Sequence, residues 1–193
     1  MAKTIFHPAG ERGHANHGWL DAHHSFSFAS WYDPTKIHFG ALRVLNDDIV
    51  AGGQGFGKHP HDNMEIITYV RQGAITHKDS MGNVGRTEAG DVQVMSAGTG
   101  IAHSEFNLED EETRLFQIWI IPDRRGHAPS WGARPFPKDS REGKFVPLAS
   151  GIAGDSDVLT INANARVLTV GQSAGGSMNA TNVTLNSGSS AAV

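Results

Sequence analysis

Cysteine is absent from this 193-residue chain. Disulfide bonds are therefore excluded, as are zinc sites built on thiolates, so the ligands of any metal must be nitrogen and oxygen atoms. Long apolar runs are also absent, so we expect no membrane-spanning helix. The first residues do not show the charged-then-apolar pattern of a secretion signal, which makes the cytoplasm the expected location.

Neither sign of charge dominates the chain. The 16 Lys and Arg residues and 20 Asp and Glu residues give a formal net charge of -4, with the two signs interspersed. Because there is no basic stripe, we expect no direct nucleic-acid binding. The 23 glycines and the scarcity of long helical patterns favour short strands joined by turns.

Six segments have the alternation or the β-branched and aromatic content of strands, and we expect them to follow one another in one closed β-barrel. These segments are residues 37–45, 59–70, 73–77, 91–95, 101–107 and 114–121. After Pro122, residues 123–141 are rich in Pro, Gly, Arg and Ser and are typical of a surface linker. Trp131 and Phe136 in this segment are expected to pack against a domain.

Two short runs, His59-Pro60-His61 and His103-Ser104-Glu105, each place two side chains that can bind a metal two positions apart. Strand side chains alternate between faces, so both members of a pair point the same way. Two such strands side by side would direct three imidazoles and one carboxylate at one point. That set suits a divalent transition metal and leaves one or two positions free. For a single His-x-His run, the alternative is a polar strand or loop.

The surroundings of the two runs are alike, which favours a metal site over that alternative. A glycine-rich segment, residues 51–58, leads into the first run, and a glycine-containing loop, residues 97–100, leads into the second. Glycines allow the backbone to come close to a site and to enter a strand tightly.

The spacing around the first run resembles the first motif of the cupin superfamily. Gly53 is followed by five residues, His59-x-His61, three residues and Glu65, and the closing Gly73 comes one residue later than usual. Around the second run, Gly90, Ser96, Gly98, His103 and Asn107 are similar to the second motif. Ser96 occupies a place where proline is commoner, and the step from Gly98 to the histidine is longer than usual.

Five longer stretches resemble the pirin family in particular. They are residues 12–20, 39–48, 59–69, 77–83 and 95–107, within a resemblance that runs from about residue 10 to about residue 170. Long uninterrupted stretches are more specific than the general cupin pattern.

The resemblance implies an all-β fold of the two-cupin, pirin-like type with one metal centre. In pirins the matching positions hold the metal, which here are His59, His61, His103 and Glu105. One divalent transition metal is implied, with Fe(II) as the first choice and Mn, Co, Ni, Cu or Zn as alternatives.

The same resemblance implies an oxidoreductase that acts on a flavonol-like small molecule and O2. Several pirins open the flavonol ring and release carbon monoxide, as quercetin 2,3-dioxygenases do. Glu105 would be the catalytic base, taking the proton of the 3-hydroxyl while the metal holds the resulting anion. Eukaryotic pirins act instead as metal-dependent regulators that bind transcription factors, and the same four residues would serve that role. A third alternative is an inactive relic with a structural metal.

The resemblance divides the chain into a metal-binding cupin domain, residues 1–122, a linker, residues 123–150, and a shortened second cupin domain, residues 151–193. Residues 157–168 look like opening strands of that second domain, and only about 25 residues follow them. A complete barrel needs more strands of about 5 or 6 residues. We expect the open sheet to pack on the first barrel, to pair with a second copy in a homodimer, or to be partly disordered.

Several further side chains have two readings. Glu65 either orients a metal-bound histidine or is an ordinary strand carboxylate. Phe56, Met64 and Met95 either line a substrate pocket or belong to the core. The histidines outside the two runs are expected to bond backbone or solvent without converging on a second metal, while two of them lie in apparent strands and could face either way. The first group is His14, His17, His23 and His24, and the second is His38 and His77.

Overall fold

The computed structural model describes residues 6–138, 141, 144–170 and 181–185. Apart from 3-10 conformation at Ala9–Glu11 and at Arg141, every regular element in these residues is a strand, which confirms the predicted all-β class. No helix among the described residues is long and apolar enough to cross a membrane.

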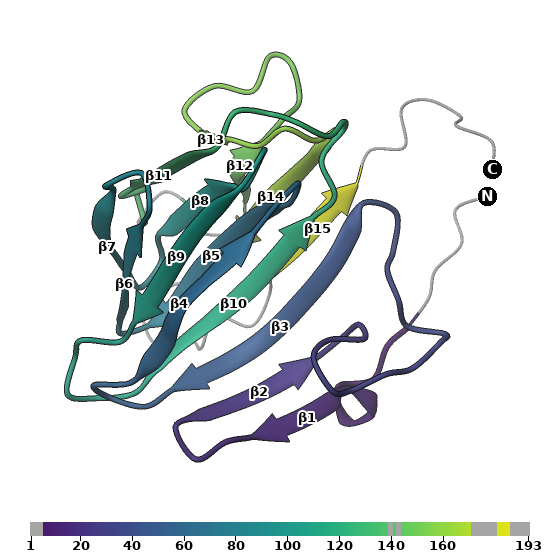
Figure 1. Ribbon diagram of the computed structural model, residues 1–193. Helices are drawn as coiled ribbons and strands as arrows, with labels where there is room; N and C mark the ends of the chain where they lie inside the picture. Colours follow the sequence, from purple (N-terminus) through teal and green to yellow (C-terminus); the bar gives the residue numbers. More distant parts are fainter. Residues whose placement is uncertain (1–5, 139–140, 142–143, 171–180, 186–193) are drawn as a thin grey trace.

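The strands form three sheets (Figure 1). The largest has seven strands in the order β1 (Gly13–Asn16), β2 (Leu20–His24), β3 (Leu42–Val50), β10 (Thr113–Ile120), β5 (Glu65–Gln72), β8 (Val92–Ser96) and β11 (Ser130–Arg134). A second sheet has the order β4 (Gly55–His61), β9 (Ile101–Phe106), β6 (Ala74–Asp79) and β7 (Val84–Glu88). The third has the order β13 (Leu159–Thr160), β12 (Phe145–Ser150), β14 (Ala165–Val170) and β15 (Thr181–Leu185).

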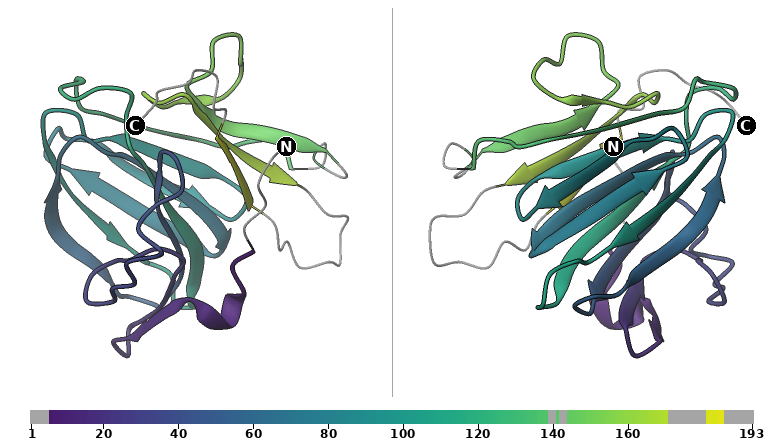
Figure 2. Two further views of the ribbon diagram at one scale, coloured as in Figure 1. Left: turned by 90° about the vertical axis from the view of Figure 1, so that its right-hand side faces the viewer. Right: turned by 60° about the vertical axis from the view of Figure 1, so that its left-hand side comes forward.

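The seven-stranded sheet is the middle layer of the molecule, with the β4-β9-β6-β7 sheet on one face and the third sheet on the other (Figure 2). Strands β5 and β8 are buried over most or all of their length because both of their faces are covered. The side chains that meet the third sheet are apolar. They include Ile67, Tyr69, Val92, Val94, Ile118 and Ile120, which form one core with Leu148, Ala149, Ile161, Ala163, Ala165 and Val167.

Several predicted elements differ from the observed ones. Segment 59–70, predicted as one strand, is two strands, because the chain reverses at Asn63, which has a φ of 45° and hydrogen-bonds through its backbone N–H to Gly98. This reversal carries the chain from one facing sheet to the other. The strand predicted at 37–45 begins at Leu42 and continues to Val50. The hairpin β1-β2 and strand β7 were not predicted.

The predicted linker contributes to the main sheet. Residues 130–134 form β11, which pairs with β8 from Ser130 opposite Ser96 to Arg134 opposite Val92. Trp131 and Phe136 pack against the body of the molecule, as expected, since both belong to hydrophobic clusters. The described residues of the third sheet pack on the main sheet, which was one of the three expectations for this part of the chain. The division into residues 1–122, 123–150 and 151–193 stays a prediction.

The turn between β5 and β6 requires glycine. Gly73 has a φ of 73°, and a Cβ there would lie 2.7 Å from the Thr113 hydroxyl oxygen. Left-handed backbone and close contact together favour a residue without a side chain. This glycine, one position late in the motif, therefore closes the hairpin that leads into the second sheet.

Candidate metal centre

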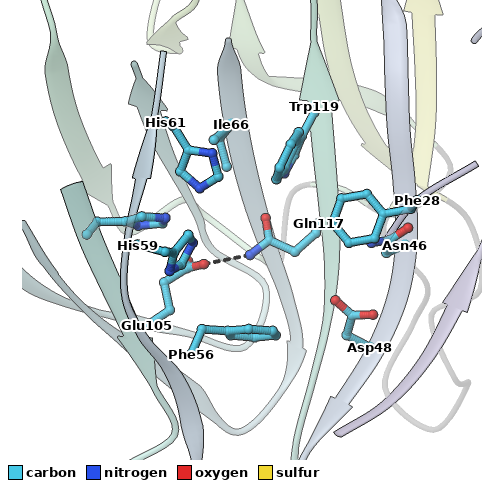
Figure 3. Close-up of a pocket in the computed structure, with 11 residues that line it drawn as sticks. Phe28, Asn46, Asp48, Phe56, His59, His61, Ile66, Glu105, Gln117 and Trp119 are labelled. Carbon is cyan, nitrogen blue, oxygen red and sulfur yellow. Dashed lines mark hydrogen bonds between the residues drawn. The ribbon is translucent and has the colours of Figure 1, made fainter. Parts of the chain in front are cut away.

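Strands β4 and β9 bring the two predicted runs together. They pair antiparallel with His59 opposite His103, and a bulge precedes this pair. The ring centroids are 4.5 Å apart for His59 and His103, 4.8 Å for His59 and His61, and 5.0 Å for His61 and His103. One ring nitrogen from each of the three histidines lies within 4.8 Å of the others. Both runs therefore direct their imidazoles at one point between the sheets (Figure 3).

The protonation of these rings suits metal binding. Burial, together with the neighbouring imidazole of His59, lowers the pKa of His61 to about 4. Burial lowers the pKa of His103 to about 3, with His59, His61 and His77 adding to the effect. Both rings are neutral at pH 7, and the neutral form is the one that offers a lone pair to a metal.

In the His59 and His103 rings, one nitrogen makes no hydrogen bond and could bind a metal. His59 Nδ1 is 2.7 Å from the Gly57 carbonyl oxygen, to which it donates, so Nε2 is the ring nitrogen left to face a metal. His103 Nε2 is buried and has no hydrogen-bond partner among the described residues. An unpaired buried nitrogen beside two other imidazoles fits a metal ion as its missing partner.

Glu105 enters the same site from β9 and is held by the opposite sheet. Its Oε1 accepts hydrogen bonds from Thr68 Oγ1 at 2.9 Å and from Gln93 Nε2 at 2.5 Å, and its Oε2 accepts one from Gln117 Nε2 at 2.7 Å. Burial raises the pKa of Glu105, although hydrogen bonds from Thr68 and Gln117 oppose the rise. A carboxylate oxygen lies within 4.8 Å of ring nitrogens of His77 and His103. The carboxyl group is therefore fixed in position by neutral donors.

The donors to Glu105 belong to a polar row that crosses the middle sheet. Neighbours in the row are directly opposite each other on adjacent strands, and the row runs from β2 to β8 through His24, Asn46, Gln117, Thr68 and Gln93. The row was not predicted, because Gln117, Thr68 and Gln93 lie in segments predicted simply as strands and the other two members lie outside the six predicted segments. The available signal was a polar residue at a core-facing position, such as Gln93 between Val92 and Val94.

His77 is a second residue that the sequence left undecided. It is completely buried, its Nδ1 lies 3.3 Å from His103 Nδ1, and its Nε2 lies 3.1 Å from Asp79 Oδ2. If His77 Nε2 donates to Asp79, its Nδ1 accepts the proton of His103 Nδ1, and His103 Nε2 is left free for a metal. The ring also stacks on Trp131, with centroids 4.8 Å apart and planes at 7°.

Glu65 takes the second of its two predicted roles. Its carboxylate accepts hydrogen bonds from Ser96 Oγ at 2.6 Å, from the Asn162 backbone N–H at 3.1 Å and from Asn162 Nδ2 at 3.3 Å. It thus links β5 to the segment before β14 rather than orienting a histidine. The carboxylate that can orient a histidine here is Asp79, which contacts His77, and His77 in turn contacts His103.

The three histidines and Glu105 open onto a cavity of ≈ 240 Å³. Aromatic and aliphatic side chains form much of its wall, and polar side chains form the part opposite His59 and His61 (Figure 3). The remaining lining residues are Phe28, Asn46, Asp48, Phe56, Ile66, Gln117 and Trp119. Phe56 thus lines the cavity, whereas Met64 and Met95 pack in a hydrophobic cluster.

The histidines near the N-terminus were expected not to converge, but two of them do. His14 and His23 are opposite each other on β1 and β2, and together with Asp21 they bring ligand atoms within 4.8 Å, so this group does converge. His14 Nε2 is 2.8 Å from Asp21 Oδ1, which already gives the ring a polar partner. His24 is buried in the polar row instead.

Comparison with known proteins gives consistent matches. The pirin family model matches residues 6–120. A Caulobacter vibrioides protein named pirin-like protein is 64% identical over 161 residues, 83% of this chain and 69% of that relative. The Escherichia coli quercetin 2,3-dioxygenase is 55% identical over 142 residues, so the match spans 73% of this chain and 61% of that relative's length.

Solved structures agree with the sequence matches. The bacterial pirin YhhW from Escherichia coli, in complex with nickel(II), is 48% identical, with a TM-score of 0.78 over 84% of this chain and 69% of that chain. A quercetin 2,3-dioxygenase from Acinetobacter baumannii is 26% identical, with a TM-score of 0.60 over 77% of this chain and 57% of that chain. Since the family model covers more than half of its residues, this all-β chain with its cluster of three histidines belongs to the pirin family.

Proposed function

We propose that this chain is a metal-dependent oxidoreductase that opens the ring of a flavonol with O2, as a quercetin 2,3-dioxygenase does. The observation that carries the proposal is Glu105, a buried carboxyl group with a raised pKa, held by three neutral donors beside three imidazoles at the end of a partly aromatic cavity. The name of the 55% identical Escherichia coli relative supports the same activity.

The proposed ligands of the metal are His59, His61, His103 and Glu105. Neutral imidazoles and a carboxylate suit a divalent transition metal, and the nickel(II) complex of YhhW supports a divalent ion. Fe(II) is the first choice that the family resemblance implies. When bound, such an ion supplies a Lewis acid that lowers the pKa of a flavonol hydroxyl and stabilises its anion.

The side chains of the site have separate tasks in this reaction. Glu105 accepts the proton of the 3-hydroxyl, and burial favours its protonated form, so the proton stays on the carboxyl group. Thr68, Gln93 and Gln117 keep that carboxyl group aimed at the cavity. Phe28, Phe56 and Trp119 exclude water and provide flat apolar surfaces for aromatic rings. In the overall reaction, flavonol and O2 become the ring-opened ester and carbon monoxide.

The test is aerobic turnover of quercetin by protein loaded separately with Fe(II), Mn, Co, Ni or Cu. We expect loss of quercetin absorbance and release of carbon monoxide with at least one ion. Glu105→Gln keeps the size of the side chain but cannot take a proton, so kcat should fall by about 10²-fold or more. Glu111→Gln, at an exposed position, is the matched control and should keep the wild-type rate.

Two results would contradict the proposal. One is full metal occupancy without turnover under every loading, which would favour the metal-dependent regulatory role. The other is wild-type turnover by Glu105→Gln, which would remove the carboxyl group from the chemistry. The cytoplasmic location and a homodimer stay predictions from the sequence.

A further inference from the structure

The cavity wall opposite the imidazoles contains buried polar atoms that have no partner. Asp48 Oδ1 and Gln117 Oε1 are buried and make no hydrogen bond within the described part of the chain, while His24, directly opposite Asn46 on β2, hydrogen-bonds the Asn46 side chain. Asn46 is 2% exposed, Asp48 3% and Gln117 8%, and all three line the cavity. Buried polar atoms in folded proteins are nearly always hydrogen-bonded, so the two unpaired oxygens of Asp48 and Gln117 on one cavity wall point to a missing partner.

The fold holds these three side chains on one surface. Asn46 and Asp48 are two positions apart on β3 and so share a face, and Gln117 is directly opposite Asn46 on β10. The amide nitrogen of Gln117 is committed to Glu105, which leaves its oxygen without a donor. Figure 3 shows Asn46 and Asp48 across the cavity from His59 and His61.

The missing partner is a donor of hydrogen bonds. The amide oxygens of Asn46 and Gln117 can only accept. Burial raises the pKa of Asp48 to about 8, and the charges of Asp47 and Glu105 add to the rise while Arg71 opposes it. This rise favours the neutral carboxyl group, with one oxygen that accepts and one hydroxyl that donates. A neutral wall of this kind does not suit a cation, but it suits hydroxyl groups.

Aromatic side chains between the imidazoles and the polar wall favour a flat ligand. Phe28 and Trp119 meet edge to face, with ring centroids 5.3 Å apart, and His61 lies edge to face with Trp119 at 5.0 Å. Aromatic side chains thus continue from the imidazoles to the polar wall. A flat aromatic molecule fits such a lining, with one polar edge at the imidazoles and a second at the opposite end.

We propose that Asn46, Asp48 and Gln117 form a hydroxyl-binding wall that selects aromatic substrates with hydroxyl groups remote from the metal-binding oxygens. This inference rests on the proposed function and extends it from the reacting end of the substrate to the opposite end. Asn46 and Asp48 act on affinity and on KM, since no hydrogen bond joins them to the Glu105 carboxyl group, whereas Gln117 also holds that group.

Binding of two flavonols tests the wall. Quercetin has hydroxyl groups away from the 3-hydroxyl, and 3-hydroxyflavone has none. The nickel-loaded protein is titrated with each one without O2, and dissociation constants are measured from quenching of tryptophan fluorescence. We expect quercetin to bind roughly tenfold more tightly, as about one or two net hydrogen bonds would give.

Variants of β3 show whether the wall causes this difference. Asn46→Leu keeps a similar volume but removes the acceptor, so the ratio of the two dissociation constants should fall to within about threefold. Asp48→Leu should do the same. Asp48→Asn keeps one acceptor and one donor, as in the neutral carboxyl group, and should restore most of the ratio. Thermal melting of each variant identifies those that fail to fold.

Several outcomes would overturn the inference. Equal binding of both flavonols by the wild type would do so without any variant, as would failure of both to bind. A wild-type ratio in folded Asn46→Leu and Asp48→Leu would also contradict it. Failure of the proposed function would give a different result. If the protein binds quercetin selectively but does not turn it over when air is admitted, the proposed dioxygenase reaction is contradicted and the hydroxyl-binding wall is still supported.

Discussion

At the scale of single residues, the site depends on which buried groups are charged. His61 and His103 are neutral because burial lowers the pKa of each imidazole, and burial raises the pKa of the Glu105 and Asp48 carboxyl groups. Asp48 and Glu105 come from opposite sheets and line the same cavity. Two carboxyl groups in one apolar cavity repel each other when both are ionised, so each favours the neutral form of the other.

Asp48 should make the stability of the metal-free protein fall as pH rises. Its pKa is about 8 in the folded protein, against an ordinary value of 3.8, so between about pH 4 and pH 8 the folded state holds more protons than the unfolded state. The free energy of unfolding should therefore decrease with pH across this window, by up to about 1.4 kcal/mol per pH unit. Asp48→Asn removes this contribution and should be more stable than the wild type at pH 8, with a smaller difference at pH 4.

Urea unfolding of the chelator-treated protein at several pH values measures this effect. Asp110→Asn, at an exposed position, is the control and should follow the wild-type pH dependence. Parallel curves for Asp48→Asn and the wild type would show that Asp48 is ionised in the folded protein.

At the scale of elements, β11 supports the proposed metal site from the outer end of the main sheet. Trp131 in β11 stacks on His77, which is next to His103, and the same indole lies against Gly85 in β7. The sequence placed Trp131 in a linker, since only the pairing of β11 with β8 makes residues 130–134 a strand. A segment predicted to be peripheral thus fixes a buried histidine.

Gly85→Ala should disturb this support. A Cβ at Gly85 would lie 2.2 Å from Trp131 Cη2, so the indole or β7 must move. We expect a loss of about 1–3 kcal/mol in the free energy of unfolding, as in other overpacked sites. Because His77 would lose its stacked neighbour, the affinity for Ni²⁺ should also fall, by about 10-fold or more.

Calorimetric titration with Ni²⁺ and thermal melting test this prediction. Gly10→Ala is the control, since a Cβ there meets no atom within 4 Å. Unchanged Ni²⁺ affinity in Gly85→Ala, despite a lower melting temperature, would mean that the stack on His77 serves stability alone.

At the scale of the whole molecule, the third sheet is part of the structure that holds the site. Its apolar side chains share one core with the back of β5, β8 and β10, the strands whose other face holds Glu105. The buried carboxylate of Glu65 also depends on this part of the chain, because Asn162 supplies two of its hydrogen bonds.

Asn162→Ala should therefore weaken the link between the main sheet and the segment before β14. It removes the side-chain donor to Glu65 and to Ser96 Oγ, which lies 3.1 Å from Asn162 Nδ2. Loss of partners at a buried carboxylate costs about 1–3 kcal/mol in the free energy of unfolding. Urea unfolding measures the loss, with Asn164→Ala at an exposed position as the control. Equal losses in the two variants would show that this link does not contribute to stability.

The sequence by itself determined the strand class and the four candidate ligands. His59, His61, His103 and Glu105 could be identified because alternation in a strand is local, and their spacing matches a known family. The split of segment 59–70 and the polar row could not be found in this way. Both depend on which strands pair and in which register, and pairing joins residues far apart in the chain.

Tertiary structure alone decided the roles of Asp48, His77 and Glu65. Each is a polar residue in an ordinary strand pattern, and its neighbours come from other strands: Glu105 for Asp48, His103 for His77 and Asn162 for Glu65. Burial and partners set protonation and hydrogen bonding, and neither exists until the sheets face each other. The chemistry of the ligand set was therefore local in the sequence, whereas the cavity around it arises only from the packing of the sheets.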